Sequence, residues 1–408
     1  MNINRLELMF NEITKYGQTN KGINRLAYSE EETQALNYIK SICDDEGFLV
    51  KKDSIGNMII RREGTQTDLP VVATGSHIDS VYEAGKYDGV IGVVSALEVL
   101  RSLNEENIET THPIELIIFA CEESARFGTA TIGSKAMTGM LKKEDTELLV
   151  DRNGISFKKA LEDVGLSSDD LQTVIRDKSE FKCFIELHIE QGPILEQKQI
   201  DIGIVSGIAA PTRFKVNVIG EASHSGSTPM SFRKDALTGA AEISLMLESI
   251  AQAEAHHGTV ATVGVCKVSP GAMNVVPGEV ELMIDIRSID AQSKKRVVDQ
   301  FTLEVNDITK RRSLSATIDL LSDEVPILMN RKIIDKLTEV CKKRELTHLE
   351  MPSGAGHDAM NMAKYCATSM IFVPSKDGLS HNQAEFTALS DIAKGANVLK
   401  EILIKLAK

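Results

Sequence analysis

The chain has 408 residues, of which 42% are hydrophobic and 26% charged, and this length predicts two domains because a single core rarely grows so large. Its formal net charge of -13 argues against a surface for nucleic acid or an anionic membrane, since both require clustered lysine and arginine. The six cysteines are scattered without a Cys-x-x-Cys pair, which argues against a cysteine-type zinc site and is typical of reduced thiols.

No targeting or membrane segment is visible in the sequence. The first residues, MNINRLELMFNEITKYG, carry charges throughout and contain no apolar core of a signal peptide. No apolar run approaches the roughly 18 residues that a membrane-spanning helix needs. We therefore expect a soluble cytoplasmic protein without a nucleic-acid or membrane partner.

The first half of the chain predicts a mostly parallel α/β sheet, because strand-like and helix-like segments alternate. Residues 30–47 carry apolar side chains at helical spacing, and a second helical pattern starts at Val90. Continuous apolar runs, typical of strands buried on both faces, occur at Val71–Ala73, Ile114–Cys121 and Phe181–Leu187. Shorter strand-like runs lie at 48–51 and 58–61.

The middle of the chain predicts an inserted ferredoxin-like α+β domain. From 212 to 325 the order is strand, helix (from about Phe232 to Ala253), strand, strand, helix, strand, which is the split βαβ pattern. In the strand 279–286 the alternating residues Val280, Leu282, Ile284 and Ile286 form the core face. The α/β pattern resumes after Pro326, with helices at 331–344 and 387–406 and a strand at 369–373. We therefore expect a catalytic domain formed by 1–211 and 326–408, with 212–325 inserted into it.

Histidines and carboxylates gather where the predicted strands end. In chain order they are His77, Asp79, Asp88, Glu122, Glu123, His188 and, late in the chain, His381. In open α/β sheets such strand ends border the ligand-binding crevice, and nitrogen and oxygen donors of this kind suit zinc or manganese. Each residue alone has a structural alternative, and the Glu122–Glu123 pair has the alternative of a solvated turn. Four strand ends with the same chemistry favour two metal ions that share one bridging carboxylate.

Several motifs resemble the dinuclear site of the M20 family of metallopeptidases and amidohydrolases. They are Gly75-Ser-His-Ile-Asp-Ser-Val81, Asp88-Gly89, Glu122-Glu123 and Ser380-His381-Asn382. His188, within Glu186-Leu-His-Ile-Glu-Gln-Gly192, resembles the amidohydrolase branch, since the peptidase branches usually carry an acidic ligand there. Further similar motifs are Asn24-Arg-Leu-Ala-Tyr28, His224-Ser-Gly-Ser-Thr-Pro-Met230, Asn274-Val-Val-Pro-Gly278, Asp285-Ile-Arg287 and Ser353-Gly-Ala-Gly-His-Asp358. The resemblance covers essentially the whole chain.

The resemblance implies two divalent metal ions per subunit, zinc in the first place and manganese, cobalt or nickel as alternatives. The first ion would bind His77, Asp88 and His188; the second would bind Asp88, Glu123 and His381. Asp79 would accept a hydrogen bond from the other nitrogen of His77, which fixes a ligand tautomer. Glu122 would be the general base that takes a proton from the attacking water.

The resemblance also implies residues that bind the substrate. His224 and Asn274 would donate to the developing oxyanion, and Gln191 and Gly356 would complete the pocket. Arg287 would anchor a substrate carboxylate, because a guanidinium forms a planar bidentate pair. Its alternative, favoured without the resemblance, is a surface ion pair with Glu281 or Asp285. In the family the residue equivalent to His224 reaches the partner subunit's site, which implies a homodimer formed through the inserted lid domain.

The function implied is hydrolysis of the ureido C–N bond of N-carbamoyl-L-amino acids to amino acid, carbon dioxide and ammonia. Allantoate amidohydrolase and β-ureidopropionase are alternatives within the same branch. A serine hydrolase using Ser353, His357 and Asp358 is disfavoured, because an adjacent histidine and aspartate do not readily form the base–orienter pair. An inactive relative is disfavoured because every expected ligand and the base are present.

Overall fold

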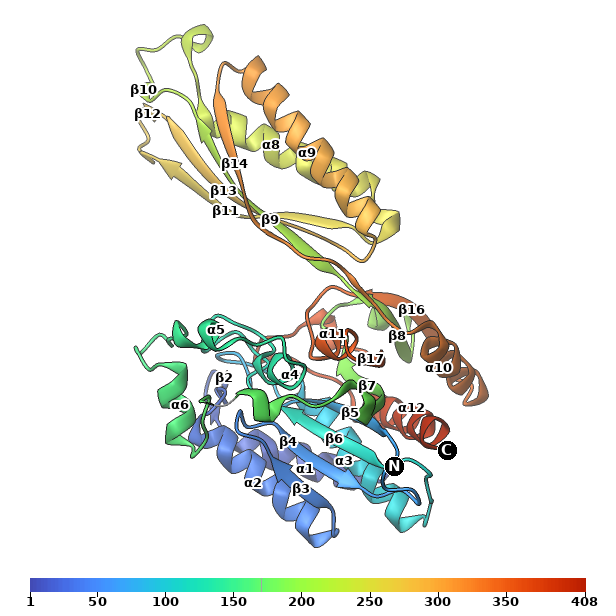
Figure 1. The fold of residues 1–408 in the computed structure, drawn as a ribbon. Helices are drawn as coiled ribbons and strands as arrows, with labels where there is room; N and C mark the ends of the chain where they lie inside the picture. Colours follow the sequence, from blue (N-terminus) through green and yellow to red (C-terminus); the bar gives the residue numbers. More distant parts are fainter. Residues whose placement is uncertain (170) are drawn as a thin grey trace. The chain divides into compact units, whose positions relative to one another are not determined.

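The computed structural model describes residues 1–169 and 171–408, which divide into two compact units (Figure 1). The larger unit comprises Met1–Ser206 and Met329–Lys408, and the smaller unit is the continuous insertion Gly207–Leu328. The insertion is wider than the range 212–325, since its first long strand already begins at Ala210. Among the described residues, no helix combines the length and apolar character required to cross a membrane.

A nine-stranded mixed sheet has the order β15-β8-β17-β7-β5-β6-β4-β3, with β16 paired to β8. Its strands belong to the larger unit, except for β15 and the last two residues of β8, which fall within the range of the insertion. The central strands β17, β7, β5 and β6 pair in parallel, and β8 and β4 extend the sheet on the two sides by antiparallel pairing. The strands are β3 Leu49–Lys52, β4 Met58–Arg62, β5 Val71–His77, β6 Ile114–Phe119, β7 Phe181–Ile189, β8 Ile202–Ile208, β15 Ile327–Leu328, β16 His348–Ser353 and β17 Ala367–Val373. Every residue of β5 and β6 is buried, as their continuous apolar runs predict.

Helices lie against both faces of this sheet. Successive residues of β7 point to opposite faces, and Glu186 accepts a hydrogen bond from Ala359 at the start of α11, whereas Leu187 packs against Gly395 of α12. The helices of the larger unit are α1 Ile3–Lys15, α2 Glu30–Asp45, α3 Val90–Glu105, α4 Ile132–Met137, α5 Lys143–Glu147, α6 Phe157–Asp163, α7 Ile194–Lys198, α10 Arg331–Lys343, α11 Ala359–Met362 and α12 Leu389–Ala407. A two-stranded ribbon pairs β1 Gln18–Thr19 with β2 Gly22–Ile23.

The smaller unit has the predicted ferredoxin-like order. Its antiparallel sheet runs β11-β13-β9-β14, and α8 and α9 pack on it. The core face of β13 is Val280, Leu282, Ile284 and Ile286, all buried, which confirms the alternation. The elements are β9 Ala210–Ile219, β10 Ser223–His224, α8 Ala236–Ala253, β11 Val260–Ser269, β12 Val275–Val276, β13 Glu279–Ser288, α9 Ala291–Arg311 and β14 Ser315–Asp323.

Two boundaries differ from the sequence prediction for identifiable reasons. β7 continues to Ile189 because its pairing with β17 extends through His188, so this histidine lies within the strand and not after it. α8 begins at Ala236, four residues after the predicted start at Phe232. The Asp235 side chain accepts hydrogen bonds from two N–H groups of the first turn and so fixes the helix start.

Candidate metal centre

The larger unit brings the five predicted metal ligands together from separate elements. His77 ends β5, Asp88 precedes α3, Glu123 follows β6 and His188 lies near the end of β7. Since β5, β6 and β7 are parallel neighbours, their carboxyl ends meet at one edge of the sheet. His381 reaches the same place from the segment before α12, in a left-handed conformation with φ 55°.

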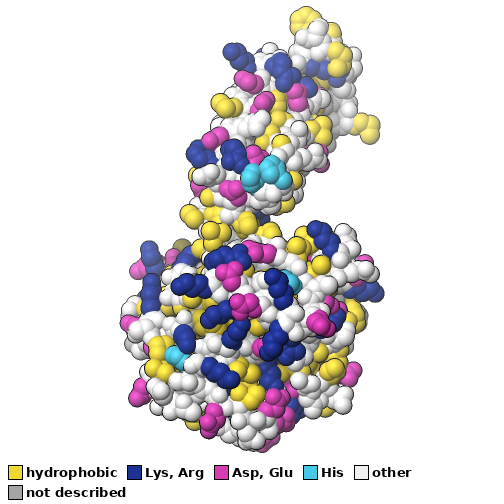
Figure 2. Space-filling view, turned by 90° about the vertical axis from the view of Figure 1, so that its right-hand side faces the viewer, with side chains coloured by type: hydrophobic (Ala, Val, Ile, Leu, Met, Phe, Trp, Pro, Cys, Tyr) yellow, Lys and Arg dark blue, Asp and Glu magenta, His cyan; other side chains and the backbone are white. Residues whose placement is uncertain are grey.

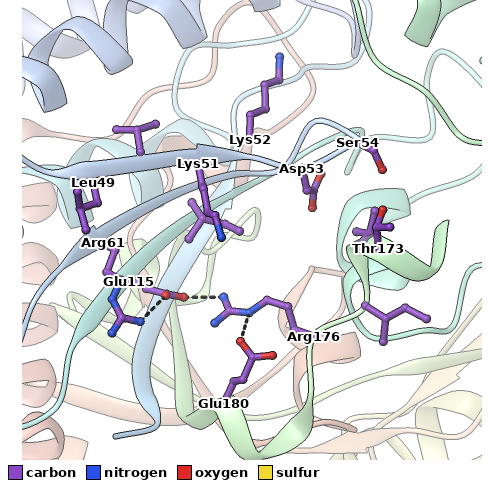
Figure 3. A pocket seen from close by; sticks show the side chains of 14 residues that line it. Leu49, Lys51, Lys52, Asp53, Ser54, Arg61, Glu115, Thr173, Arg176 and Glu180 are labelled. Carbon is purple, nitrogen blue, oxygen red and sulfur yellow. Dashed lines mark hydrogen bonds and ion pairs between the residues drawn. The ribbon is translucent and has the colours of Figure 1, made fainter. Parts of the chain in front are cut away.

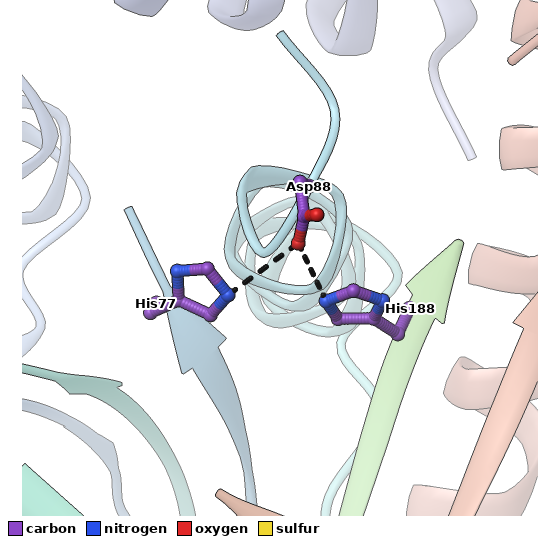
Figure 4. A group of neighbouring side chains, drawn as sticks. All are labelled: His77, Asp88 and His188. Atoms are coloured by element: carbon purple, nitrogen blue, oxygen red, sulfur yellow. Dashed lines mark ion pairs between the residues drawn. The ribbon is translucent and has the colours of Figure 1, made fainter. Parts of the chain in front are cut away.

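Asp88 lies between two groups of donors (Figure 4). Its Oδ1 lies 3.1 Å from His188 Nε2 and 3.6 Å from His77 Nε2. Its Oδ2 lies 3.3 Å from His381 Nε2, which is also 3.3 Å from Glu123 Oε1. Each group of three offers ligand atoms within 4.8 Å of one another, and Asp88 belongs to both. One carboxylate is thus placed to bridge two cations.

The two inner histidines present the same nitrogen to Asp88. His77 Nδ1 lies 3.0 Å from the carbonyl oxygen of Asp79, and His188 Nδ1 lies 2.9 Å from the carbonyl oxygen of Ile189. A carbonyl accepts, so both Nδ1 atoms carry the proton, and Nε2 is left with a lone pair for a metal. The fold therefore fixes the tautomer that ligation requires.

Asp79 contacts His77 through its backbone carbonyl, and its carboxylate has two further partners. Its carboxylate accepts hydrogen bonds from the backbone N–H groups of Glu122, at 3.1 Å, and Glu123, at 3.0 Å. The distance from Asp79 Oδ1 to His77 Nδ1 is 3.6 Å, so the Asp79 carbonyl is the closer partner of that ring. Asp79 is 1% exposed, and its carboxylate fixes the backbone of Glu122 and Glu123.

The charges of this cluster match a site for cations. Burial acts to raise the pKa of Asp88, but contacts with His188, His381 and His77 outweigh it and hold that pKa well below its usual range. Contacts with Asp88 and Glu123 raise the pKa of His381 to about 10. Burial, together with Glu123, raises the pKa of Glu122 well above its ordinary value. Several buried carboxylates that rely on protons for compensation would be neutralised equally well by divalent cations, so the residues present fit a metal centre.

The predicted substrate residues of the larger unit lie near Asp88 or in an adjacent loop. Gln191 Nε2 donates to Asp88 Oδ2 at 2.7 Å, and Gln191 Oε1 is buried without a hydrogen-bond partner. Gly356 lies in the exposed loop after β16. An unpartnered buried acceptor is costly, so Gln191 is suited to accept from a bound N–H group.

The predicted substrate residues of the smaller unit form two sets. β10 pairs with β12, which places His224 opposite Val275 and therefore beside Asn274. His224 Nδ1 accepts from the backbone N–H groups of Gly226 and Ser227, so its proton lies on Nε2, where it can be donated. Arg287 pairs with Asp285 through Nε, at 2.7 Å, and Nη2, at 3.2 Å. This is one of the two ion pairs anticipated as the alternative role for Arg287.

Three residues around the cluster were missed as functional candidates, and a fourth, His357, was considered only as part of a serine hydrolase. Glu186 and His357 form a third buried donor group with His188, and Ser380 and Glu385 contact the Asp88 segment. Glu186 and Ser380 lie within the motifs given above, but nothing in those motifs marks them. Of the three missed residues, Glu385 has a sequence signal, because it follows the ligand candidate His381 by a few residues, as Asp79 follows His77. Ser353 Oγ lies 2.9 Å from His357 Nε2, yet Asp358 makes no hydrogen bond to that ring, so no serine-hydrolase triad is formed.

A cavity of about 870 Å³ lies elsewhere on the larger unit, against β3, β4 and β6 (Figure 3). Four of its charged side chains pair with one another, since Glu115 contacts both Arg61 and Arg176, and Arg176 also contacts Glu180. Glu115 stands at the opposite end of β6 from Glu122. On the face of the larger unit shown in Figure 2, basic side chains lie among acidic ones, which is typical of a solvated surface.

Two groups of histidine and carboxylate donors, which share Asp88, lie at the ends of parallel strands in an α/β domain. This arrangement is typical of a metallohydrolase. The model of Peptidase family M20/M25/M40 matches residues 73–405, and the chain belongs to this family. It is 44% identical over 408 residues to an uncharacterized hydrolase of Haemophilus influenzae, covering 100% of this chain and 99% of the relative. It is 38% identical over 404 residues to an N-carbamoyl-L-amino-acid amidohydrolase of Pseudomonas sp., covering 98% and 97%.

Other relatives and a solved structure indicate the type of bond that is hydrolysed. Relatives 34–36% identical are ureidoglycolate hydrolases and allantoate amidohydrolases. The crystal structure of an amidase of the hydantoinase/carbamoylase family from Burkholderia multivorans superposes with a TM-score of 0.94 at 34% identity, covering 100% of this chain and 98% of that one. The chain is therefore a hydrolase of C–N bonds, as the sequence predicts.

A substitution at Gly89 tests how closely the backbone packs against His77. It has φ 65°, and a Cβ added to it would lie 2.4 Å from the His77 ring. Gly89→Ala is expected to displace His77, to destabilise the protein by about 1 kcal/mol or more, and to reduce the zinc retained per chain after dialysis. Gly154→Ala is the control, because Gly154 also has a positive φ but no neighbour within 4 Å. Equal zinc content in both variants would contradict the arrangement.

Proposed function

We propose that the protein is a metal-dependent amidohydrolase that cleaves the ureido C–N bond of N-carbamoyl-L-amino acids. The observation that carries the proposal is the position of Glu122 beside the linked donor groups. Its Oε2 lies 3.7 Å from His77 Nε2, and its backbone is held by Asp79. Similarity to N-carbamoyl-L-amino acid amidohydrolases over almost the full chain supports this choice of substrate.

The two donor groups support the ligands that we propose. His77, Asp88 and His188 would hold one divalent ion, Asp88, Glu123 and His381 a second, and zinc is the first candidate because imidazole and carboxylate donors suit it. When bound, such ions polarise the ureido carbonyl and acidify a water molecule. We retain manganese, cobalt and nickel as alternatives.

Glu122 moves the proton in the proposed reaction. Its carboxylate takes a proton from the attacking water and later delivers it to the leaving nitrogen of the ureido group. Water adds to the ureido carbon, the C–N bond to the amino acid breaks, and carbamic acid remains. Carbamic acid then decomposes to carbon dioxide and ammonia. Asp79 keeps Glu122 in register with Glu123, so that one carboxylate ligates while its neighbour stays free to carry the proton.

Five residues are proposed to recognise the substrate. Gln191 Oε1 is suited to accept from the ureido N–H groups, because it has no hydrogen-bond partner among the residues that the structure describes. His224 Nε2 and the Asn274 amide are proposed oxyanion donors, and Gly356 is proposed to bind through its backbone. Arg287 is proposed to anchor the carboxylate, which would then share this guanidinium with Asp285. In line with the family resemblance, we propose a cytoplasmic homodimer formed through the smaller unit, in which each His224 serves the partner subunit's site.

The substrate is tested by ammonia release from N-carbamoyl-L-methionine, N-carbamoyl-β-alanine and allantoate in parallel. We expect the highest kcat/KM with the L-amino acid derivative, loss of activity in EDTA, and recovery with zinc, manganese or cobalt. A clear preference for allantoate or for the β-alanine derivative would favour the alternative named for that substrate. Activity that survives EDTA and does not respond to added metal would contradict the mechanism.

Substitutions at the adjacent residues Glu122 and Glu123 distinguish the proposed general base from the proposed metal ligand. Glu122→Gln is expected to keep its metal content and lose about 10²–10⁴-fold in kcat, the usual contribution of a general base. Glu123→Gln is the matched control and is expected to lose metal as well as activity. Metal content is measured by elemental analysis and kcat by ammonia release. Near-normal turnover in Glu122→Gln would show that another group carries the proton.

A further inference from the structure

Glu385 joins two segments of the metal centre that are almost 300 residues apart in sequence. Its carboxylate is buried, and Oε1 accepts from the backbone N–H groups of Tyr87, at 2.7 Å, and Asp88, at 3.1 Å. Its Oε2 lies 3.1 Å from the hydroxyl of Ser380, the residue before His381. One side chain thus holds the backbone of the proposed bridging ligand and the segment that carries the outermost histidine.

The same contacts orient the Asp88 side chain. The Ser380 hydroxyl lies 2.6 Å from Asp88 Oδ2, which also accepts from Gln191 Nε2 at 2.7 Å. A hydroxyl has one proton, so Ser380 can donate to only one carboxylate at a time. When Ser380 donates to Asp88, this hydrogen bond fixes the rotation of the Asp88 carboxylate. Ser380 belongs to the same segment as Glu385, which is attached to loop 84–88.

The surroundings of Glu385 leave little freedom on the side of the ligand loop. A Cβ placed on Gly85 would lie 2.3 Å from Glu385 Cβ and 2.5 Å from its Oε1. Loop 84–88 therefore lies directly against this side chain. Glu385 also borders a polar cavity of about 330 Å³, which Gln383 and the loop residues Ala84, Gly85 and Lys86 line as well. A shortened side chain at 385 would open to this cavity and not to a sealed void, so the fold should survive its truncation.

We infer that Glu385 is a positioning residue that fixes the separation of Asp88 and His381 and thereby sets the affinity for metal. Hydrogen bonds from backbone N–H groups to a carboxylate are stronger than neutral ones. Without them the N–H groups of Tyr87 and Asp88 lose their acceptor, and loop 84–88 loses its attachment to the His381 segment. The inference rests on the proposed metal-dependent function, but it concerns ligand geometry and not the substrate.

The test compares zinc binding by wild type, Glu385→Ala and Glu385→Gln, using competition with a chromogenic chelator. Loss of an outer partner of a ligand typically weakens metal binding about 10- to 100-fold, and we expect this loss in Glu385→Ala. Glutamine keeps an acceptor for both N–H groups and can donate to Ser380, so Glu385→Gln is expected to restore most of the affinity. Amide hydrogen exchange of the metal-free proteins is expected to be faster at Tyr87 and Asp88 in the alanine variant only.

Asp201→Ala is the matched control. Asp201 also joins remote segments, since its carboxylate accepts from the backbone N–H of Thr347, at 2.9 Å, and from its hydroxyl, at 2.8 Å, but it contacts no proposed ligand. Its zinc affinity should equal that of wild type. Unchanged zinc affinity and unchanged exchange in Glu385→Ala would overturn the inference while the proposed function stands. Wild-type protein that binds zinc but hydrolyses no ureido compound would overturn the proposed function and leave the role of Glu385 intact.

Discussion

The candidate metal centre depends on a single shared carboxylate. Asp88 has a side chain only 9% exposed, with two imidazoles on one oxygen and a third on the other. A carboxylate so far from water is unstable unless positive charge faces both of its oxygens. His77 at the end of β5 and His188 on β7 would hold a cation beside one oxygen, and His381, from the segment before α12, would help to hold a second cation beside the other. The roles proposed for Glu122, Gln191 and Glu385 all depend on where these donors hold Asp88.

The sequence predicts most of this centre because its signals are local. A buried strand that stops at a histidine or at an acidic pair is visible in a few residues, and parallel strands must bring such ends to one edge. His77, Glu122–Glu123 and His188 follow from this rule, whereas the ligand roles of Asp88 and His381 come from the family resemblance. The alternation in β13 predicts the core face of the smaller unit for a similar reason, since a period of two needs no knowledge of the partner strands.

Contacts that depend on distant segments could not be predicted. Asp79 holds the backbone of Glu122 and Glu123, 43 and 44 residues later, and no pattern around Asp79 signals which N–H groups it will meet. The strand β7 passes through His188 because β17 continues beside it, which only the pairing register shows. Glu385 stands in a polar segment without periodicity, and its importance follows solely from its contacts with residues 87 and 88. The pairing of Arg287 with Asp285 was one of two anticipated alternatives, and the choice between them needed coordinates.

The central claim is that one carboxylate, Asp88, bridges two metal ions. Crystals of the zinc-loaded protein, measured above and below the zinc absorption edge, test this claim most directly. We expect two anomalous peaks per chain, separated by about 3.5–4 Å as in other paired sites. Both peaks should lie within bonding distance of Asp88, one beside His77 and His188 and the other beside Glu123 and His381. A single peak, or a pair that Asp88 does not bridge, would contradict the account.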